Sequence, residues 1–137
     1  MKFYCVTPCI NAEQHIEETM LSVLSQTIFK QDEHSLYFSI QDGGSSDNTV
    51  KIIEKICQNF SNRKNLEINY HSEPDYGMYD ALAKGFEYGP ESDIYCYINA
   101  GDYYSPQAFE IVSGIFINGQ AHFITGLNVW YNDQSHV

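Results

Sequence analysis

Apolar residues recur along this chain with two alternating periods, one typical of strands and one typical of helices. Four runs are rich in β-branched and aromatic residues or alternate every second position, which predicts strands over residues 2–7, 35–41, 66–72 and 93–99. Apolar spacings of three and four predict amphipathic helices. One starts after Asn11 as N-cap, and two more cover residues 50–60 and 78–86. A further helix is expected to begin at Ser105 and Pro106, as cap and first residue. Two further strands are expected over residues 121–126 and 127–132.

Strands that alternate with helices predict an α/β fold with a mostly parallel sheet and right-handed crossovers. The carboxyl ends of parallel strands meet at one edge, and ligands bind there in such folds. A polar cluster follows each of the four main predicted strands, and three of these clusters contain a carboxylate. The clusters are Thr7-Pro8 to Asn11, Asp42 to Gly44, Glu73 to Asp75, and Asn99 to Asp102. Because crowded carboxylates repel one another, this many acids at one edge favours a shared ligand site over independent helix caps.

Composition and charge narrow the function classes. With 137 residues, 43% hydrophobic and 15% aromatic, the chain is expected to form a single domain over residues 1–137. Its formal net charge of −11 disfavours nucleic acid as a partner, because a phosphate backbone would be repelled. No apolar run approaches the length of a membrane span, so no membrane segment is expected in this chain.

The four cysteines form no CxxC pair and the five histidines are scattered, so a zinc site is not expected. Reduced thiols are the simplest interpretation, and no signal-peptide pattern opens the chain. We therefore expect a cytoplasmic protein, with any peripheral attachment to the inner face of the membrane made by parts outside this chain.

Taken together, the clusters resemble the donor-binding half of a family 2 glycosyltransferase with the GT-A fold, a Rossmann-like α/β/α sandwich. The matching blocks follow the family's order: VTPCINAEQHIEETMLSVLSQT, QDGGSSDNTVKII, SEPDYGMYDALAKGF and YINAGDYY. The resemblance implies transfer of a sugar from a UDP- or GDP-linked donor to an unknown acceptor in polysaccharide or glycoconjugate biosynthesis. It also implies inversion of configuration and a divalent cation, Mn²⁺ or Mg²⁺.

In the first two blocks, the resemblance implies that Thr7, Pro8 and Asn11 shape the wall for the base and ribose. A strand end and a helix cap would explain the same residues, and for Asn11 the two interpretations stay equal. Glu13 occupies the family's acid in this loop, although acids are common in a first helical turn. Asp42 would accept a hydrogen bond from the base, next to Gly44, which allows close backbone approach. Residues 45–47 are expected to cap the next helix.

In the third block, Asp75 matches the family's acid near the nucleotide and donor sugar, and Gly77 allows a tight turn into the next helix. Tyr79, Asp80 and Lys84 match a recurring YDAxNKG pattern. Lys84 could reach the phosphates or pair with Asp80, and the pattern does not decide between them.

The fourth block carries the expected metal site, and Asn99 is expected to contact the nucleotide sugar. The family's motif usually contains two acids, whereas this chain has Gly101 at the first of these positions. Asp102 stands where the principal metal ligand lies. One carboxylate can suffice, because Mg²⁺ or Mn²⁺ also takes oxygens from the diphosphate and from water. A plain turn aspartate is the alternative.

The family's acceptor half, which supplies the general base, finds no match here. Asp133 lies near the end of the chain without a recognisable base motif. We therefore expect the GT-A fold to be truncated at its C-terminal acceptor half. A non-catalytic nucleotide-sugar-binding module is the alternative function. A sugar nucleotidyltransferase is weaker, since no glycine-rich phosphate loop opens the chain.

Overall fold

Four parallel strands form the centre of the protein. The computed structural model describes residues 1–119 and 121–126. The strands are β1 (Lys2–Cys9), β2 (Ser35–Asp42), β3 (Leu66–Ser72) and β4 (Ile94–Tyr97). All pairs between neighbouring strands are parallel, as the alternation of strands and helices predicts. The expected α/β class with a mostly parallel sheet is therefore confirmed.

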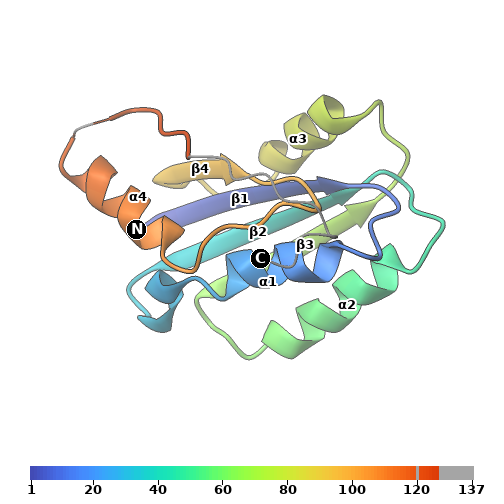
Figure 1. Ribbon diagram of the computed structural model, residues 1–137, viewed down its shortest axis with the longest axis horizontal. Helices are drawn as coiled ribbons and strands as arrows, with labels where there is room; N and C mark the ends of the chain where they lie inside the picture. The colour runs from blue at the N-terminus through green and yellow to red at the C-terminus, as the bar shows by residue number, and fades with distance from the viewer. Residues whose placement is uncertain (120, 127–137) are drawn as a thin grey trace, which may run out of the picture.

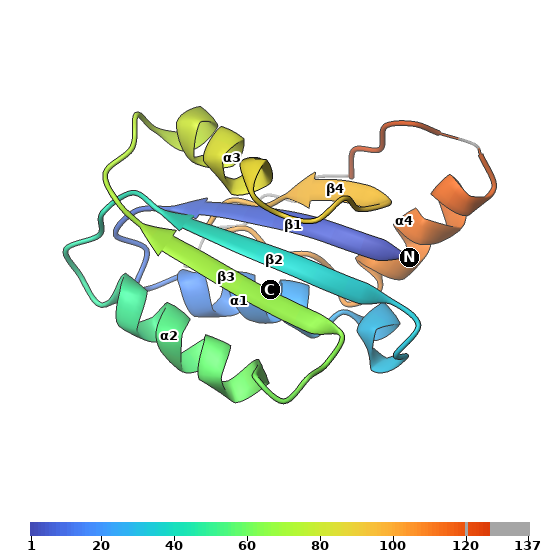
Figure 2. The ribbon, with the colours of Figure 1, turned by 180° about the vertical axis from the view of Figure 1, so that it is seen from behind.

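Helices cover both faces of this sheet. The helical segments are α1 (Ile16–Leu24), the 3₁₀ turn η1 (Thr27–Lys30), α2 (Thr49–Phe60), α3 (Met78–Glu87) and α4 (Ala108–Ile117). Figures 1 and 2 show α1 and α2 on one face and α3 on the other, with α4 near the start of β1. The result is the three-layer arrangement that an α/β chain needs to bury both sheet faces.

The strand order β3-β2-β1-β4 places a reversal between β1 and β4. The chain first builds outward from β1 to β2 and β3, and then returns to place β4 on the other side of β1. The helices that follow β1 and β3 lie on opposite faces of the sheet (Figures 1 and 2), and a crevice opens between them at the carboxyl ends of β1 and β4. Such a switch point is the usual ligand position in open α/β sheets.

The core lies mainly between β1, β2 and the α1–α2 layer. Phe3, Cys5 and Phe38 point into it and are at most 1% exposed. Phe3 stacks on Phe109 of α4 at 5.0 Å between ring centroids, which attaches α4 to the first strand. On the opposite face, Val6 packs so closely on Gly85 of α3 that a Cβ there would lie 2.4 Å from Val6 Cγ1. This packing holds the C-terminal half of α3 against the sheet.

Several sequence expectations need correction. Asn11 is not an N-cap, because α1 begins at Ile16 and Asn11 has φ +45° in the preceding loop. Ser105 and Pro106 form a turn before α4, whose N-cap is Gln107. Residues 121–126 contain no strand, although their composition is β-rich. The strand expected over residues 127–132, and Asp133, lie outside the described residues. Among the helices of the described ranges, none has both the length and the apolar character that crossing a membrane requires.

Candidate functional site

A pocket of about 330 Å³ opens at the carboxyl ends of β1 and β4, at the switch point of the sheet. Its lining residues are Pro8, Cys9, Ile10, Asn11, Ala12, His15, Asp75, Gly77, Met78, Ala81, Asn99 and Ala100. Segments after β1, β3 and β4 therefore meet around one cavity, whereas the predicted cluster after β2, Asp42 to Gly44, does not line it.

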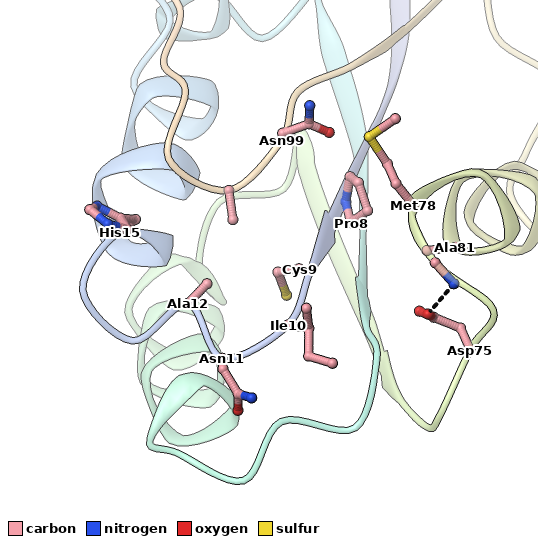
Figure 3. Close-up of a pocket in the computed structure, with 12 residues that line it drawn as sticks. Pro8, Cys9, Ile10, Asn11, Ala12, His15, Asp75, Met78, Ala81 and Asn99 are labelled. Atoms are coloured by element: carbon pink, nitrogen blue, oxygen red, sulfur yellow. Dashed lines mark hydrogen bonds between the residues drawn. The ribbon is translucent and has the colours of Figure 1, made fainter. Parts of the chain in front are cut away.

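The pocket has two walls of different character (Figure 3). The loop after β1 and the start of α1 form one wall, on which His15 lies. Across the cavity, Asp75 and Met78 lie at the start of α3, and Asn99 lies above Pro8. Apolar surface with a few polar groups is typical of small-molecule pockets, because the polar groups orient the ligand and the apolar surface holds it.

Hydrogen bonds join the loop after β1 to the loop after β2. We call the two bonded segments, residues 11–13 and 45–49, the loop clamp. The Ser46 N–H donates to Asn11 Oδ1 (2.9 Å), and the Asn11 N–H donates to Ser45 Oγ (2.7 Å). The backbone and side-chain N–H groups of Asn48 both donate to Glu13 Oε2, at 3.1 and 3.0 Å. Asn11 and Glu13 thus hold the loop after β1 against the loop after β2.

The remaining clamp contacts correct one expectation. Residues 45–47 were expected to cap α2, but Ser45 and Ser46 bond to the neighbouring loop instead. Only Asp47 acts near the helix start, where Oδ1 accepts from the Thr49 N–H (2.9 Å). The Thr49 hydroxyl in turn accepts from the Ala12 N–H (2.8 Å). The polar residues after β2 therefore stabilise the loop that forms the pocket wall more than they cap α2.

Asp42 ends β2 and is the most heavily bonded carboxylate in the described part of the chain. In the sheet register it lies between Cys9 of β1 and Ser72 of β3. Its Oδ2 accepts from Ser72 Oγ (2.7 Å) and from the N–H groups of Gly44 (3.2 Å) and Ser45 (2.9 Å). Its Oδ1 accepts from the Ser45 hydroxyl and from Cys9 Sγ at 3.7 Å.

These contacts keep Asp42 ionised although the residue is only 2% exposed. Burial raises the pKa of its carboxyl, but the hydrogen bonds from Ser45, Ser72 and Gly44 outweigh burial and bring the pKa below its usual value. Burial and the adjacent Asp42 charge raise the pKa of the Cys9 thiol far above its usual value. Cys9 therefore stays protonated and donates to Asp42.

Asp75 is the carboxylate that lines the pocket. Its Oδ1 accepts from the Gly77 N–H at 2.9 Å (Figure 3), which orients the side chain at the turn into α3. Its carboxylate also lies against Gly43, where a Cβ would come within 3.0 Å of Oδ2. The absence of a side chain at Gly43 lets the loops after β2 and β3 approach each other. Gly77 has φ +106°, which confirms the tight turn expected there.

The YDAxNKG-like segment makes an ion-pair network outside the pocket. Lys84 Nζ lies 3.0 Å from Asp80 Oδ2 and 3.8 Å from Glu73 Oε1, so the structure favours pairing for Lys84. Asp80 also accepts from the Tyr76 N–H (3.0 Å). Tyr79 is 80% exposed and does not line the pocket. These side chains therefore stabilise the turn that presents Asp75.

The segment after β4 carries the expected metal ligand. Asp102 is exposed, and Gly101 before it has φ +102°, a conformation that disfavours residues with a side chain. Asn99 Oδ1 is buried without a hydrogen-bond partner, and Asn99 lines the pocket. Within residues 1–119 and 121–126, no group of three or more His, Cys, Asp or Glu side chains could hold a metal ion. Hard oxygen donors suit Mn²⁺ or Mg²⁺, but the described residues would supply few of its ligands.

A family model for glycosyl transferase family 2 matches residues 4–136. The chain belongs to this family. No curated protein sequence matches the chain.

Solved glycosyltransferase structures share the fold of this family 2 domain. Staphylococcus aureus TarS 1–349, solved with UDP-GlcNAc, superposes with a TM-score of 0.70 at 20% identity, over 86% of this chain and 32% of that chain. The mannosyltransferase PcManGT of Pyrobaculum calidifontis, solved with GDP-Man and Mn²⁺, superposes with a TM-score of 0.64 at 17% identity, over 76% of this chain and 29% of that chain. This domain therefore spans about a third of the length of these structures.

The structure brings some of the predicted site residues of the family 2 domain together and separates others. Pro8, Asn11, Asp75, Gly77 and Asn99 line the pocket. The others lie around it without lining it: Thr7, Glu13, Asp42, Gly44, Tyr79, Asp80, Lys84 and Asp102. Thr7 is fully buried, and its hydroxyl makes no hydrogen bond in the described part of the chain.

Sequence reasoning missed several lining residues of the family 2 pocket. Cys9 and Ile10 lie between two residues that were predicted, so continuity of the loop could have identified them. Met78 and Ala81 are three residues apart on the first turns of α3, and helical spacing places them on one face. For His15, no signal in the sequence distinguishes it from a surface histidine.

Proposed function

We propose that this domain binds the nucleotide-diphosphate sugar of a glycosyltransferase. The observation that carries the proposal is the pocket at the switch point of a family 2 fold, lined by Asp75 and Asn99 together with apolar Ile10 and Met78. This combination suits a nucleoside, whose base needs an apolar surface and whose hydroxyls need acceptors. Two relatives of the same fold, solved with UDP-GlcNAc and with GDP-Man, support the class of ligand.

In this proposal the side-chain oxygen Oδ1 of Asn99, which is buried and has no hydrogen-bond partner among the described residues, accepts a hydrogen bond from a ligand hydroxyl. Asp75 provides a second acceptor on the facing wall. Asp42 keeps its predicted role as acceptor for the ring N–H of the base. Its weakest contact is the 3.7 Å bond from Cys9, a pocket-lining residue, and that bond is the one a base would replace.

We further propose that Asp102 holds Mn²⁺ or Mg²⁺ with the diphosphate. The bound cation would neutralise the charge of the diphosphate leaving group. The protein carries a formal charge of −11, and none of its lysines or arginines lines the pocket. A diphosphate in this pocket would otherwise face Asp75 and Asp102 without a compensating positive charge. PcManGT, solved with GDP-Man and Mn²⁺, supports the choice of ion.

In this proposal, the whole protein transfers the sugar to an acceptor. It is an inverting transferase of the cytoplasm and acts in polysaccharide or glycoconjugate synthesis. The second candidate is a nucleotide-sugar-binding module without catalysis. Gly101 in place of an acid favours this second candidate. We expect no sugar transfer by this chain alone, and sustained turnover of UDP-GlcNAc or GDP-Man would contradict that expectation.

Calorimetry with UDP and with GDP, each in the presence and absence of Mn²⁺, tests the proposed function. One of the two nucleotides should bind, and more tightly with Mn²⁺. Asp102→Asn should remove the gain from Mn²⁺ without weakening metal-free binding, because it removes a negative charge that faces the diphosphate. If neither nucleotide binds, donor recognition is wrong. Equal affinities with and without Mn²⁺ would remove only the metal role of Asp102.

A further inference from the structure

One face of α1 carries a row of polar side chains inside an otherwise apolar interface. Thr19, Ser22 and Gln26 are spaced by three and four residues and so lie on the same side of the helix and its C-terminal extension. Thr19 is 0% and Gln26 is 1% exposed. We call these three residues the α1 polar row.

Every residue of the α1 polar row bonds to the backbone of the segment between β4 and α4. Thr19 Oγ1 accepts from the Gly101 N–H (2.9 Å), and Ser22 Oγ accepts from the Tyr104 N–H (3.2 Å). Gln26 donates from Nε2 to the Ser105 carbonyl (2.7 Å) and accepts at Oε1 from the Phe109 N–H (2.9 Å). The four bonds together fix the backbone of residues 101–109.

Packing alone does not require these side chains. A buried polar group contributes little net stability and is destabilising when it loses its partner, so apolar residues would fill the same space with less risk. The other buried side chains of α1, such as Met20 and Val23, are apolar. The polar row instead supplies hydrogen-bond partners to a stretch that has no regular structure before Ala108, where the Gly101 and Tyr104 N–H groups bond to side chains and not to a helix or sheet ladder.

Asp102 lies between the first two anchors of this row. The N–H of Gly101 on one side is held by Thr19, and the N–H of Tyr104 on the other is held by Ser22. The Asp102 N–H itself donates to the Asn99 carbonyl (3.0 Å). Its backbone is therefore restrained from both directions while its carboxylate stays exposed.

We propose that the α1 polar row, with Thr19 as its main member, positions the Asp102 carboxylate for the divalent cation. This inference rests on the proposed function, because it assumes that Asp102 binds the ion. Thr19 and Ser22 are positioning residues that act through the backbone of Gly101 and Tyr104. A carboxylate held in one place loses less conformational freedom on binding, which strengthens a site that has few protein ligands.

Thr19→Val tests the inference, since it keeps the shape of the side chain and removes the acceptor for Gly101. Thr19→Ser keeps the hydroxyl and is the rescue variant. Asn65→Ala is the matched control, because it removes two hydrogen bonds of a buried side chain, to Phe29 and His34, away from the pocket. Ser22→Ala gives a second test at a half-buried position if Thr19→Val does not fold.

Two measurements separate positioning from general stability. Paramagnetic broadening by Mn²⁺ in the presence of UDP or GDP should centre on the Asp102 amide in the wild type and in Thr19→Ser, and weaken in Thr19→Val. The gain in UDP or GDP affinity from Mn²⁺ should fall by about tenfold in Thr19→Val, the effect expected for one lost hydrogen bond. The affinity without metal should stay unchanged in all variants.

The outcomes distinguish the inference from the proposed function. If Asp102→Asn abolishes the broadening and neither Thr19→Val nor Ser22→Ala weakens it, the positioning role is wrong and the metal role stands. If Asn65→Ala weakens it as much as Thr19→Val, the effect is one of stability and the inference is wrong. If the wild type shows no broadening near Asp102, the metal role and the positioning role both fail, while metal-free binding of UDP or GDP still tests donor recognition.

Discussion

Asp42 and Asp102 are both carboxylates at the carboxyl edge of the sheet, but the protein treats them in opposite ways. Asp42 is 2% exposed and receives hydrogen bonds from Cys9, Gly44, Ser45 and Ser72. Asp102 is exposed, and its carboxylate makes no hydrogen bond or ion pair with the described residues, although its backbone is restrained. The protein itself satisfies the charge at the first position. At the second position the charge stays exposed, which is where we propose the cation binds.

The largest effect should come from removing the satisfied charge. Asp42→Ala leaves the N–H groups of Gly44 and Ser45 and the hydroxyl of Ser72 without their acceptor, so the free energy of unfolding should fall by about 2–4 kcal/mol. Urea denaturation measures this change. Nucleotide affinity should also fall, by about 1–3 kcal/mol. Asp102→Asn is the control, and equal destabilisation by both variants would contradict the contrast between the two sites.

The pH dependence of stability sharpens the same prediction. Because the pKa of Asp42 is lower in the folded protein than in the unfolded chain, its charge stabilises the fold above the ordinary carboxyl pKa, and this contribution is lost as the pH falls through the folded value. The difference in stability between the wild type and Asp42→Asn should therefore narrow below about pH 4. A gap that stays constant down to acid unfolding would show that the charge of Asp42 does not matter.

A smaller effect is expected from restoring the missing acid at Gly101. Gly101 has φ +102° and free space around it, so Gly101→Asp suffers from backbone strain and not from a clash, at about 1–2 kcal/mol. Urea denaturation of Gly101→Asp and Gly101→Ala should show the same loss, because Ala has the same backbone penalty without the carboxylate. A Gly101→Asp variant that is as stable as the wild type, and whose nucleotide affinity gains more from Mn²⁺, would contradict the expected backbone strain.

The smallest effect should come from Lys84. Its pairing with Asp80 and Glu73 occupies it outside the pocket, so Lys84→Met should leave UDP and GDP affinity unchanged and lower the melting temperature only slightly. Lys55→Met on α2 is the control for removing one positive charge. If calorimetry shows weaker nucleotide binding only for Lys84→Met, the ammonium group reaches the phosphates after all.

Much of the fold could be predicted from the sequence because the apolar periods are strong. The third strand was expected at residues 66–72 and is Leu66–Ser72, since its alternation stops at the turn before Pro74. The convergence of the loops after the strands also followed from sequence alone, because parallel strands fix which ends meet. Pro8, Asp75 and Asn99 were placed at the pocket by that argument together with the family resemblance.

The remaining errors come from interactions between distant residues. Asn11 looks like a helix cap, but its side chain accepts from Ser46, which is 35 residues away in the chain. Asp42 was expected to accept a hydrogen bond from the base, which stays a prediction, but the sequence did not show that its place in register between Cys9 and Ser72 buries it. Residues 121–126 have a strand-like composition without forming a strand, since composition alone does not supply a partner strand.

The loop clamp has a consequence for engineering this domain. Residues 11–13 and 45–49 exchange hydrogen bonds in both directions, so neither loop keeps its shape when the other is replaced. A transplant that aims to change base preference would therefore have to move both segments as one piece. Single-loop chimeras between relatives should lose order in the loop that was left in place.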